Sequence, residues 1–488
     1  MATKREVKGL GSGGALLGVA KLYFLIASYA TVLALTRLIE PSEFGSYSAV
    51  GRLIAVPNMV IIYTLMFTVS RPLAAEFERG TPSYDAIRRR GFRLAGVLGG
   101  VVSVTFFVGA PWFARALSEP SLTWPIRIVA PISLVYALYA VNIGTINARR
   151  AFPRQAALDI LMATSKAGLI IVAAALGLGL TLTLGGFTAA SVVALSVSVL
   201  WVRRVRPPRV EGESSGAPMK ELAGILIVFT LATNLLLSAD LFVLKHFAVD
   251  AARKEAVGFY SGAQYVAQVP YSLLNAVSLL MFPLIATLHA EGELARVRTY
   301  VTQTAKVTVV LLALMGTVAA GAAPEIMRLL FPPTYTVAAD DLRRIVVGYS
   351  GYSFTVTVAW ILNSSQRSKT ALGLVAAALG VSAVGAWFAA PILGSDGVAW
   401  AVLAAGVAGV LASLVALERH FGVRLPLVWS LKIAVAVAVT GLLGAAWDAE
   451  GKVLILAKLV ALTVVFIGTV AGTRAVTVAE VKALRRRD

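Results

Sequence analysis

Long apolar stretches recur along the whole chain and limit the kinds of fold it can adopt. Each is long enough to cross a hydrocarbon layer about 30 Å thick as a helix, and charged breaks separate one from the next. Of the 488 residues, 58% are hydrophobic and 14% are charged, with a mean hydropathy of +0.81. A soluble core needs far less apolar sequence. The sequence therefore predicts an all-α polytopic membrane protein, because a membrane β-barrel shows short alternating segments instead.

The apolar stretches predict about fourteen transmembrane helices, arranged as two six-helix lobes and a C-terminal helix pair. One long Pro/Gly/Ser-rich break follows the sixth helix and predicts a cytoplasmic linker over residues 206–220. The predicted N-lobe covers 1–205 and the predicted C-lobe 221–420, and residues 421–488 hold the last two helices and a basic tail. The expected spans are 13–36, 45–70, 94–114, 125–147, 157–178, 185–202, 221–246, 257–288, 307–324, 344–364, 370–392, 397–417, 430–447 and 453–473.

Arginine and lysine clusters fall on one side of the predicted membrane. With a cytoplasmic N-terminus, the even-numbered connections and both tails carry these clusters, in agreement with the positive-inside rule. This predicts cytoplasmic N- and C-termini in a cell inner membrane, and it explains most of the net charge of +19 without nucleic acid as a partner. The chain has no cysteine, and we expect neither a cofactor nor a metal site. The clusters are Arg88–Arg90, Arg149, Arg150, Arg154, Arg203, Arg204, Arg206, Arg209 and Arg485–Arg487.

A short motif after the first helix recurs after the seventh. Gly45, Tyr47 and Ser48 are repeated as Gly258, Tyr260 and Ser261, at an offset of 213 residues. Further matches at similar offsets preserve the order of the helices. An offset of six helices predicts two parallel repeats related by an axis along the membrane normal, an arrangement that supports alternating access. The alternative is that turns and interfacial belts reuse Gly and Tyr.

The same motifs resemble the polysaccharide transporter family, the Wzx-like O-unit flippases of the multidrug/oligosaccharidyl-lipid/polysaccharide (MOP) flippase superfamily. The resemblance implies a central cavity and export of undecaprenyl-diphosphate-linked glycans. It implies as partners a polyprenyl-diphosphate-linked glycan, membrane lipids and polysaccharide polymerase machinery. The residues that carry it are Arg37-Leu38, Pro41, Glu43, Phe44-Gly45 and Tyr47, then Asp240 and Gly258-Phe259-Tyr260.

Three cations within the predicted N-lobe helices are candidates for binding the diphosphate. An Arg or Lys at mid-bilayer costs at least about 2.5 kcal/mol, so each should face a watery cavity or a partner. Lys21 and Lys166 lie in the inner half of the predicted membrane, and Arg52 lies nearer its outer side. The alternative for the two lysines is snorkelling to the headgroups. Together they predict a cationic path for an anionic lipid carrier.

Polar residues in the predicted C-lobe and elsewhere are candidates for binding the glycan. Spacings of four, three and four residues place the polar side chains of the eighth predicted helix on one face, where they suit either sugar hydroxyls or helix–helix contacts. Asp240 near the end of the seventh helix is a candidate for ion coupling or for a structural pair, and we favour the structural role. The other glycan candidates are Gln264, Gln268, Tyr271 and Asn275 on the eighth helix, with Asn142 and Asn363 elsewhere.

We therefore expect a transporter rather than an enzyme: a flippase that moves undecaprenyl-diphosphate-linked oligosaccharide from the cytoplasmic to the periplasmic leaflet by alternating access, for surface polysaccharide export. A lipid II flippase and a cation-coupled drug antiporter of the same superfamily stay open as alternatives. A drug antiporter would need a carboxylate in the N-lobe cavity, whereas the first helix carries Lys21. A membrane glycan polymerase or ligase is the enzymatic alternative, which the short predicted outer loop at 325–343 disfavours.

Overall fold

The computed structural model describes residues 4–79, 84–203, 219–274 and 285–475, except 286 and 290, and these residues contain helices and turns but no strand. Within this part, eleven helices are long and apolar enough to span a membrane, or up to twelve if one broken pair counts as a single span. Helices dominate because a chain in lipid must satisfy every backbone N–H and C=O group internally. The protein is thus an all-α polytopic membrane protein, as predicted.

The chain divides into two compact units, each described below by itself. Unit 1 comprises Met1–Asn234 and Ala248–Gly258, and unit 2 comprises Leu235–Phe247 and Phe259–Asp488. The predicted linker at 206–220 lies mostly outside the described residues, so the predicted lobe boundaries stay predictions.

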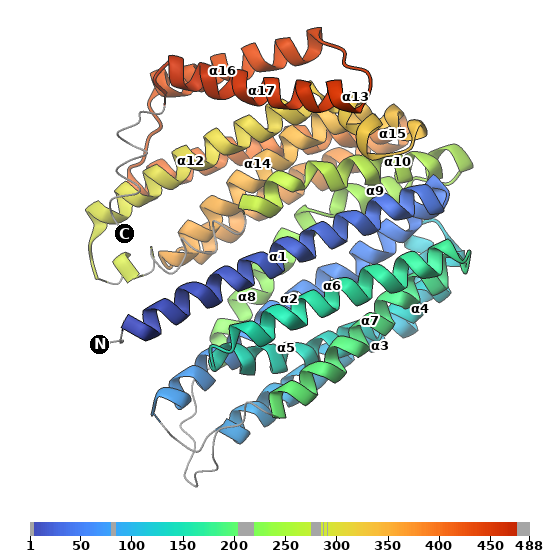
Figure 1. Ribbon diagram of the computed structural model, residues 1–488, viewed down its shortest axis with the longest axis vertical. Helices are drawn as coiled ribbons and strands as arrows, with labels where there is room; N and C mark the ends of the chain where they lie inside the picture. Colours follow the sequence, from blue (N-terminus) through green and yellow to red (C-terminus); the bar gives the residue numbers. More distant parts are fainter. Residues whose placement is uncertain are drawn as a thin grey trace. The chain divides into compact units, whose positions relative to one another are not determined.

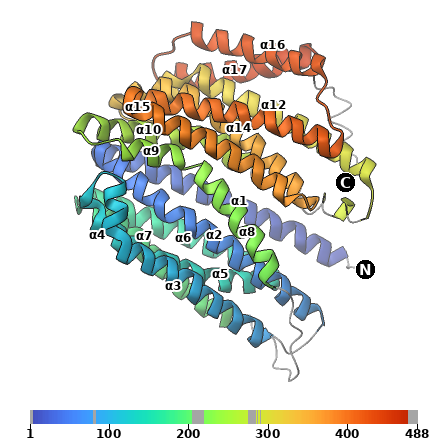
Figure 2. The ribbon, with the colours of Figure 1, turned by 180° about the vertical axis from the view of Figure 1, so that it is seen from behind.

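Unit 1 is a bundle of long helices, shown in blue to green in Figure 1 and from behind in Figure 2. Within the bundle, α5 packs against α2, α3 and α7, and α6 packs against α1 and α7. The helices are α1 (Lys4–Leu38), α2 (Pro41–Arg79), α3 (Tyr84–Ala116), the short η1 (Pro120–Leu122), α4 (Thr123–Val129), α5 (Ile132–Ala148), α6 (Phe152–Ala175), α7 (Gly179–Arg203) and most of α8 (Met219–Leu236).

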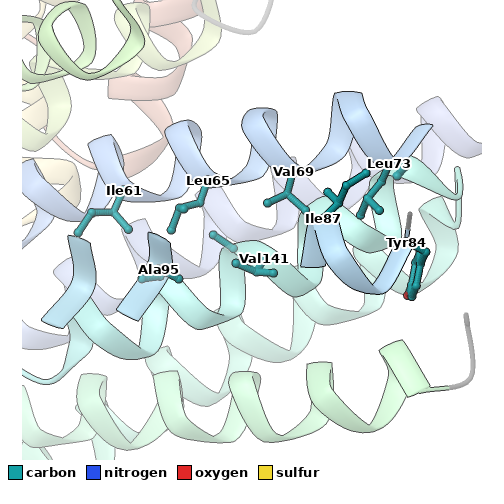
Figure 3. Close-up of a cluster of buried hydrophobic side chains, with 11 residues drawn as sticks. Ile61, Leu65, Val69, Leu73, Tyr84, Ile87, Ala95 and Val141 are labelled. Atoms are coloured by element: carbon teal, nitrogen blue, oxygen red, sulfur yellow. The ribbon is translucent and has the colours of Figure 1, made fainter. Parts of the chain in front are cut away.

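An apolar cluster between α2, α3 and α5 forms part of the core of unit 1 (Figure 3). Its residues on α2 repeat every four positions, a spacing that puts them on one side of a helix. Val141 from α5 and Ala95 from α3 are fully buried against that side. The α2 residues are Ile61, Leu65, Val69 and Leu73.

The two glycines of the repeated motif lie against each other within unit 1. A Cβ atom on Gly45 would lie 2.8 Å from the backbone nitrogen of Gly258, and one on Gly258 would lie 1.9 Å from the carbonyl oxygen of Pro41. No side chain fits at such a distance from backbone, so this close approach of α2 to the chain at Gly258 requires glycine. The recurrence of glycine thus has a packing reason, whereas the pseudo-repeat of whole lobes stays a prediction.

Unit 2 contains the later helices, shown in yellow-green to red in Figure 1. Within it α14 packs against α12 and α15, and the C-terminal pair α16 and α17 packs against α12. The helices are α9 (Ala239–His246), part of α10 (Ala251–Ala267), α12 (Leu294–Gly321), α13 (Ala323–Leu330), the short η2 (Pro333–Ala338), α14 (Ala339–Ser364), α15 (Ser368–Phe421), α16 (Leu427–Ala446) and α17 (Lys452–Gly472).

Gly394 divides the 54-residue α15 into two helices. Its φ of 60° and ψ of −137° are not helical, and a φ in this region favours glycine. A Cβ atom on Gly385 would lie 3.1 Å from that of Ala401, although in a straight helix two residues so far apart in sequence would be separated by roughly 24 Å. The two halves therefore fold back on each other, as the separate predicted spans at 370–392 and 397–417 require.

Several predicted helices are broken in the structure. The predicted span at 125–147 has a turn between α4 and α5 at Pro131, which lacks the N–H group that a continuous helix would use, but it still counts as one span. The span at 221–246 breaks between α8 and α9, where Ser238 has a φ of −135°. In the span at 257–288, a turn at Gln268 precedes Pro270, and residues 275–284 lie outside the described part. The total of fourteen helices therefore stays a prediction.

Candidate functional site

Lys21 of α1 forms an ion pair with Asp159 of α6 in unit 1. The Lys21 Nζ lies 2.9 Å from Asp159 Oδ2, and the two side chains are 63% and 12% exposed. A second contact joins the same helices, since the hydroxyls of Tyr23 and Thr164 lie 2.8 Å apart. Asp159 was not predicted, because it lies on α6 and the acidic residues weighed in the N-lobe were those of the first helix. Unit 1 does hold a carboxylate beside its candidate cations, on α6.

Lys166 lies seven residues after Asp159 and therefore on nearly the same side of α6, about 10 Å further along the helix. Its Nζ is 4.0 Å from the ring centroid of Phe187 on α7, a cation–π contact. Arg52 is half-buried on α2. The three predicted cations therefore come from three helices of unit 1, and the structure associates Lys21 and Lys166 with the same side of α6.

Asn142 is almost fully buried and connects three helices of unit 1. It accepts a hydrogen bond of 3.4 Å from Arg88 on α3 and donates one of 2.9 Å to Ser198 on α7. The Arg88 guanidinium also lies over the rings of Tyr84 and Phe92. Because both amide atoms of Asn142 are engaged, this geometry favours a packing role over glycan binding for Asn142.

Asp240 in unit 2 is fully buried and surrounded by hydrogen-bond donors. The Tyr260 hydroxyl donates to its Oδ2 at 2.8 Å, and the Gln264 amide nitrogen lies 2.9 and 2.8 Å from its two oxygens. The Tyr349 hydroxyl lies 3.1 Å from Asp240 Oδ2 and equally far from the Leu237 carbonyl oxygen. Neutral donors stabilise a buried carboxylate well, so Asp240 connects the start of α9 to α10 and α14.

The remaining candidates of the predicted polar stripe differ in their surroundings. Gln268 donates a hydrogen bond of 3.2 Å to the Leu237 carbonyl, next to the Asp240 network. Tyr271 is half-buried, and Asn275 lies outside the described residues. Asn363, at the end of α14, has a buried side-chain oxygen that meets no hydrogen-bond donor in the described part of the chain. The first two residues of the predicted stripe, Gln264 and Gln268, therefore lie in or next to the Asp240 hydrogen-bond network.

A buried charge pair that was not predicted from the sequence joins α17 and α13 in unit 2. Lys458 of α17 and Glu325 of α13 are 2% and 3% exposed, and their Nζ and Oε1 atoms are 2.6 Å apart. Lys458 also donates to the Trp447 carbonyl. At the surface beside this pair, Arg328 binds Asp448 at 2.7 Å, and this hydrogen bond holds the pKa of the Asp448 carboxyl below its usual range. These contacts attach α17 to α13.

No group of three or more His, Asp or Glu side chains that would suit a metal ion occurs among the described residues. The candidate residues described above carry ammonium, guanidinium, amide and hydroxyl groups, with the Asp159 carboxylate beside Lys21. Such groups bind anions and sugars by charge and hydrogen bonding.

Comparison with known proteins supports the architecture. Residues 34–340 match the sequence profile of a family described as "Polysaccharide biosynthesis protein", and no curated protein matches the sequence significantly. Among solved structures, the lipid II flippase MurJ in an inward closed conformation superposes with a TM-score of 0.76 at 14% identity, covering 94% of this chain and 98% of that one.

Two further solved structures share the fold. An inward-facing multidrug resistance MATE family transporter of the MOP superfamily gives a TM-score of 0.63 at 13% identity, over 82% of this chain and 98% of that one. A MOP superfamily transporter from Pyrococcus furiosus, whose binding pocket is described as having reverse polarity, gives 0.58 at 14% identity, over 90% and 99%. At such low identity these likenesses establish the fold alone.

Proposed function

This chain belongs to the polysaccharide biosynthesis protein family, and from that premise we propose that it is a flippase for undecaprenyl-diphosphate-linked oligosaccharide. Family membership agrees with the resemblance noted in the sequence, and the fold is that of MOP flippases and transporters. In this proposal the protein moves its substrate from the cytoplasmic to the periplasmic leaflet by alternating access, for surface polysaccharide export.

The observation that carries this proposal is the set of cations on unit 1. Lys21, Arg52 and Lys166 come from three helices, and the described protein leaves 63% of the Lys21 side chain uncovered. A cation within a membrane helix is costly and is retained where it meets an anion or water. A diphosphate supplies that anion, while the polyprenyl tail remains in lipid and polar side chains meet the glycan.

The substrate-binding roles of the other candidates follow from the same proposal. Asn363 has a buried side-chain amide oxygen that meets no donor among the described residues, and Gln268, Tyr271 and Asn275 extend the stripe of amide and hydroxyl groups. Gln264 and Asn142 are engaged in protein hydrogen bonds and contribute to packing first. The hydrogen bonds of Asp240 to Tyr260, Gln264 and Tyr349 favour a structural role over ion coupling.

Orientation is part of the proposal. The arginine clusters support cytoplasmic termini in the inner membrane by the positive-inside rule. The sequence contains no cysteine, so a single Glu450→Cys substitution gives a clean probe at an exposed site between α16 and α17. Labelling of this cysteine in intact cells by an impermeant maleimide is expected. Labelling only after the cells are opened would reverse the orientation.

The test of function is deletion of the gene, followed by analysis of the lipid-linked glycans. A diphosphate-linked oligosaccharide should accumulate on the cytoplasmic leaflet, and surface polysaccharide should be lost. Accumulation of no glycan-lipid would contradict the proposal.

A polysaccharide polymerase is a further proposed partner, and cross-linking in cells tests whether it lies beside this protein.

A lipid II flippase is the second candidate, favoured by the overlap with MurJ across 94% of this chain. The two candidates share a diphosphate-linked lipid and differ in the glycan. Expression of this protein in cells depleted of their own lipid II flippase separates them. Rescue of growth supports the second candidate, and failure of a well-expressed protein to rescue supports the first.

A further inference from the structure

The ion pair between Lys21 and Asp159 is unequally exposed, and this asymmetry determines which partner a ligand can reach. Lys21 presents 63% of its side chain, whereas Asp159 presents 12%. Its Oδ2 lies 2.9 Å from the Lys21 Nζ. Asp159 therefore holds the ammonium from the buried side, and an incoming anion reaches it from the exposed side.

Two buried polar side chains, Gln155 and Tyr139, accompany Asp159. Gln155, one turn earlier on α6, is buried, and its side-chain oxygen meets no hydrogen-bond donor within the described residues. The Tyr139 hydroxyl on α5 is likewise buried without a hydrogen-bond partner among them. Lys21 is thus the cation whose contact with Asp159 the structure records, and it lies on a flexible four-carbon stem with three N–H donors.

We propose that Asp159 is a built-in counter-ion of Lys21. It lowers the affinity of Lys21 for the substrate's diphosphate, so that the substrate can dissociate after translocation. This inference rests on the proposed function and adds to it a residue that sets how tightly the substrate is held. A pathway for ions needs binding that favours entry but still permits exit. An ammonium with no counter-ion would bind a diphosphate tightly and release it slowly. In the Lys21–Asp159 pair, the Asp159 carboxylate competes with the diphosphate for the Lys21 ammonium.

A purely structural role explains the same contact less well. One partner of this pair is largely uncovered by protein, unlike the enclosed pair of Lys458 and Glu325. The neighbouring hydrogen bond between Tyr23 and Thr164 already joins α1 to α6 without a charge. Asp159→Asn is nearly isosteric and removes a buried charge, so we expect the protein to fold.

The experiment measures binding of undecaprenyl diphosphate to the purified full chain in lipid nanodiscs. Asp159→Asn should bind roughly tenfold more tightly than wild type, because a unit of repulsive charge is removed close to the ligand, and it should turn over more slowly. Asp340→Asn is the matched control: it removes the same charge from an exposed pair with Arg343 in unit 2, and its affinity should be unchanged.

A double-mutant comparison shows whether the tighter binding of Asp159→Asn depends on Lys21. In a Lys21→Gln background, Asp159→Asn should no longer tighten binding. The inference is overturned if Asp159→Asn binds undecaprenyl diphosphate no more tightly than wild type. It is also overturned if Asp159→Asn raises the affinity by the same factor in the Lys21→Gln background.

The exchanged pair, Lys21→Asp with Asp159→Lys, keeps the test decisive if Asp159→Asn fails to fold. It preserves the pair but moves the ammonium to the buried position, so binding should be weaker than in wild type. Wild-type affinity in the exchanged protein overturns the inference. Absence of binding by wild type itself overturns the proposed function together with this inference, whereas wild-type binding with an unchanged Asp159→Asn overturns the inference alone.

Discussion

The charge pairs of the two units differ in how far protein encloses them. In unit 1 the Lys21 side chain is 63% exposed and has one recorded carboxylate contact, with Asp159. In unit 2 Lys458 and Glu325 are 2% and 3% exposed, and further contacts with backbone and side chains enclose them. In the proposed function, the accessible Lys21 binds substrate, whereas the enclosed pair of Lys458 and Glu325 connects helices. Residue type and helix position alone do not separate these cases.

The largest effect is expected from breaking the enclosed pair of unit 2. Lys458→Met leaves the Glu325 carboxylate buried without its cation, which should cost about 3–5 kcal/mol of stability. Thermal unfolding in detergent should show a strongly destabilised or unfolded protein, and adding Glu325→Gln should recover much of the loss. Lys452→Met, at the exposed start of the same helix, is the control. A Lys458→Met protein as stable as this control would mean that the pair does not attach α17 to α13.

A smaller but clear effect is expected at Asp240. Asp240→Ala removes the acceptor for Tyr260 and one of the two acceptors for Gln264 and for Tyr349, and unsatisfied buried donors should cost about 3 kcal/mol. Thermal unfolding of purified protein measures this loss, and transport should fall in proportion to the folded fraction. Lost transport by a fully stable Asp240→Ala protein would instead assign Asp240 to ion coupling.

The polar stripe beyond this network should matter more for transport than for folding. Gln268→Leu loses one hydrogen bond to the Leu237 carbonyl, which Tyr349 still approaches, so the loss of stability should stay near 1 kcal/mol. Export should fall while the protein still accumulates in the membrane, and the same result is expected for Asn275→Leu. Disappearance of both variants from the membrane fraction would identify the stripe as packing.

The smallest effect is expected at the exposed pair of Arg328 and Asp448. Since the folded pKa of Asp448 lies below its unfolded value, the pair stabilises the protein at neutral pH and loses this contribution as the pH falls through the folded pKa. Asp448→Asn should therefore lower the melting temperature slightly at pH 7 and leave it unchanged at strongly acidic pH. An equal shift at both pH values would contradict the assignment.

The helices were predictable from the sequence because lipid allows little other than helix for long apolar stretches. The ends of the helices were less predictable. α1 begins at Lys4, whereas the predicted span begins at residue 13, and α12 begins at Leu294, whereas the predicted span begins at residue 307. Polar residues continue these helices beyond the apolar stretch, where hydropathy no longer identifies them. The breaks at Pro131 and Gly394 follow from residue chemistry, whereas the break at Ser238 carries no comparable sequence signal.

The contacts of the site were beyond prediction because they join residues far apart in sequence. Lys21 was identified as a costly intramembrane charge, but its partner Asp159 lies on α6, and only the packing of α1 against α6 brings them together. Glu325 and Lys458 are separated further still. An acid or a base inside an apolar span was the available signal in each case, and it shows that a partner is needed without showing which residue it is.

The central claim is that the cations of unit 1 recognise a diphosphate, and Arg52 offers its most direct test. The measurement is translocation of undecaprenyl-diphosphate-linked glycan in proteoliposomes, normalised to monodisperse protein. A guanidinium gives paired hydrogen bonds to phosphate oxygens, which an ammonium replaces only as a point charge. Arg52→Lys should therefore keep part of the activity and Arg52→Ala almost none, at wild-type stability. Normal translocation by well-folded Arg52→Ala would contradict the claim for this residue and leave Lys21 and Lys166 as its only support.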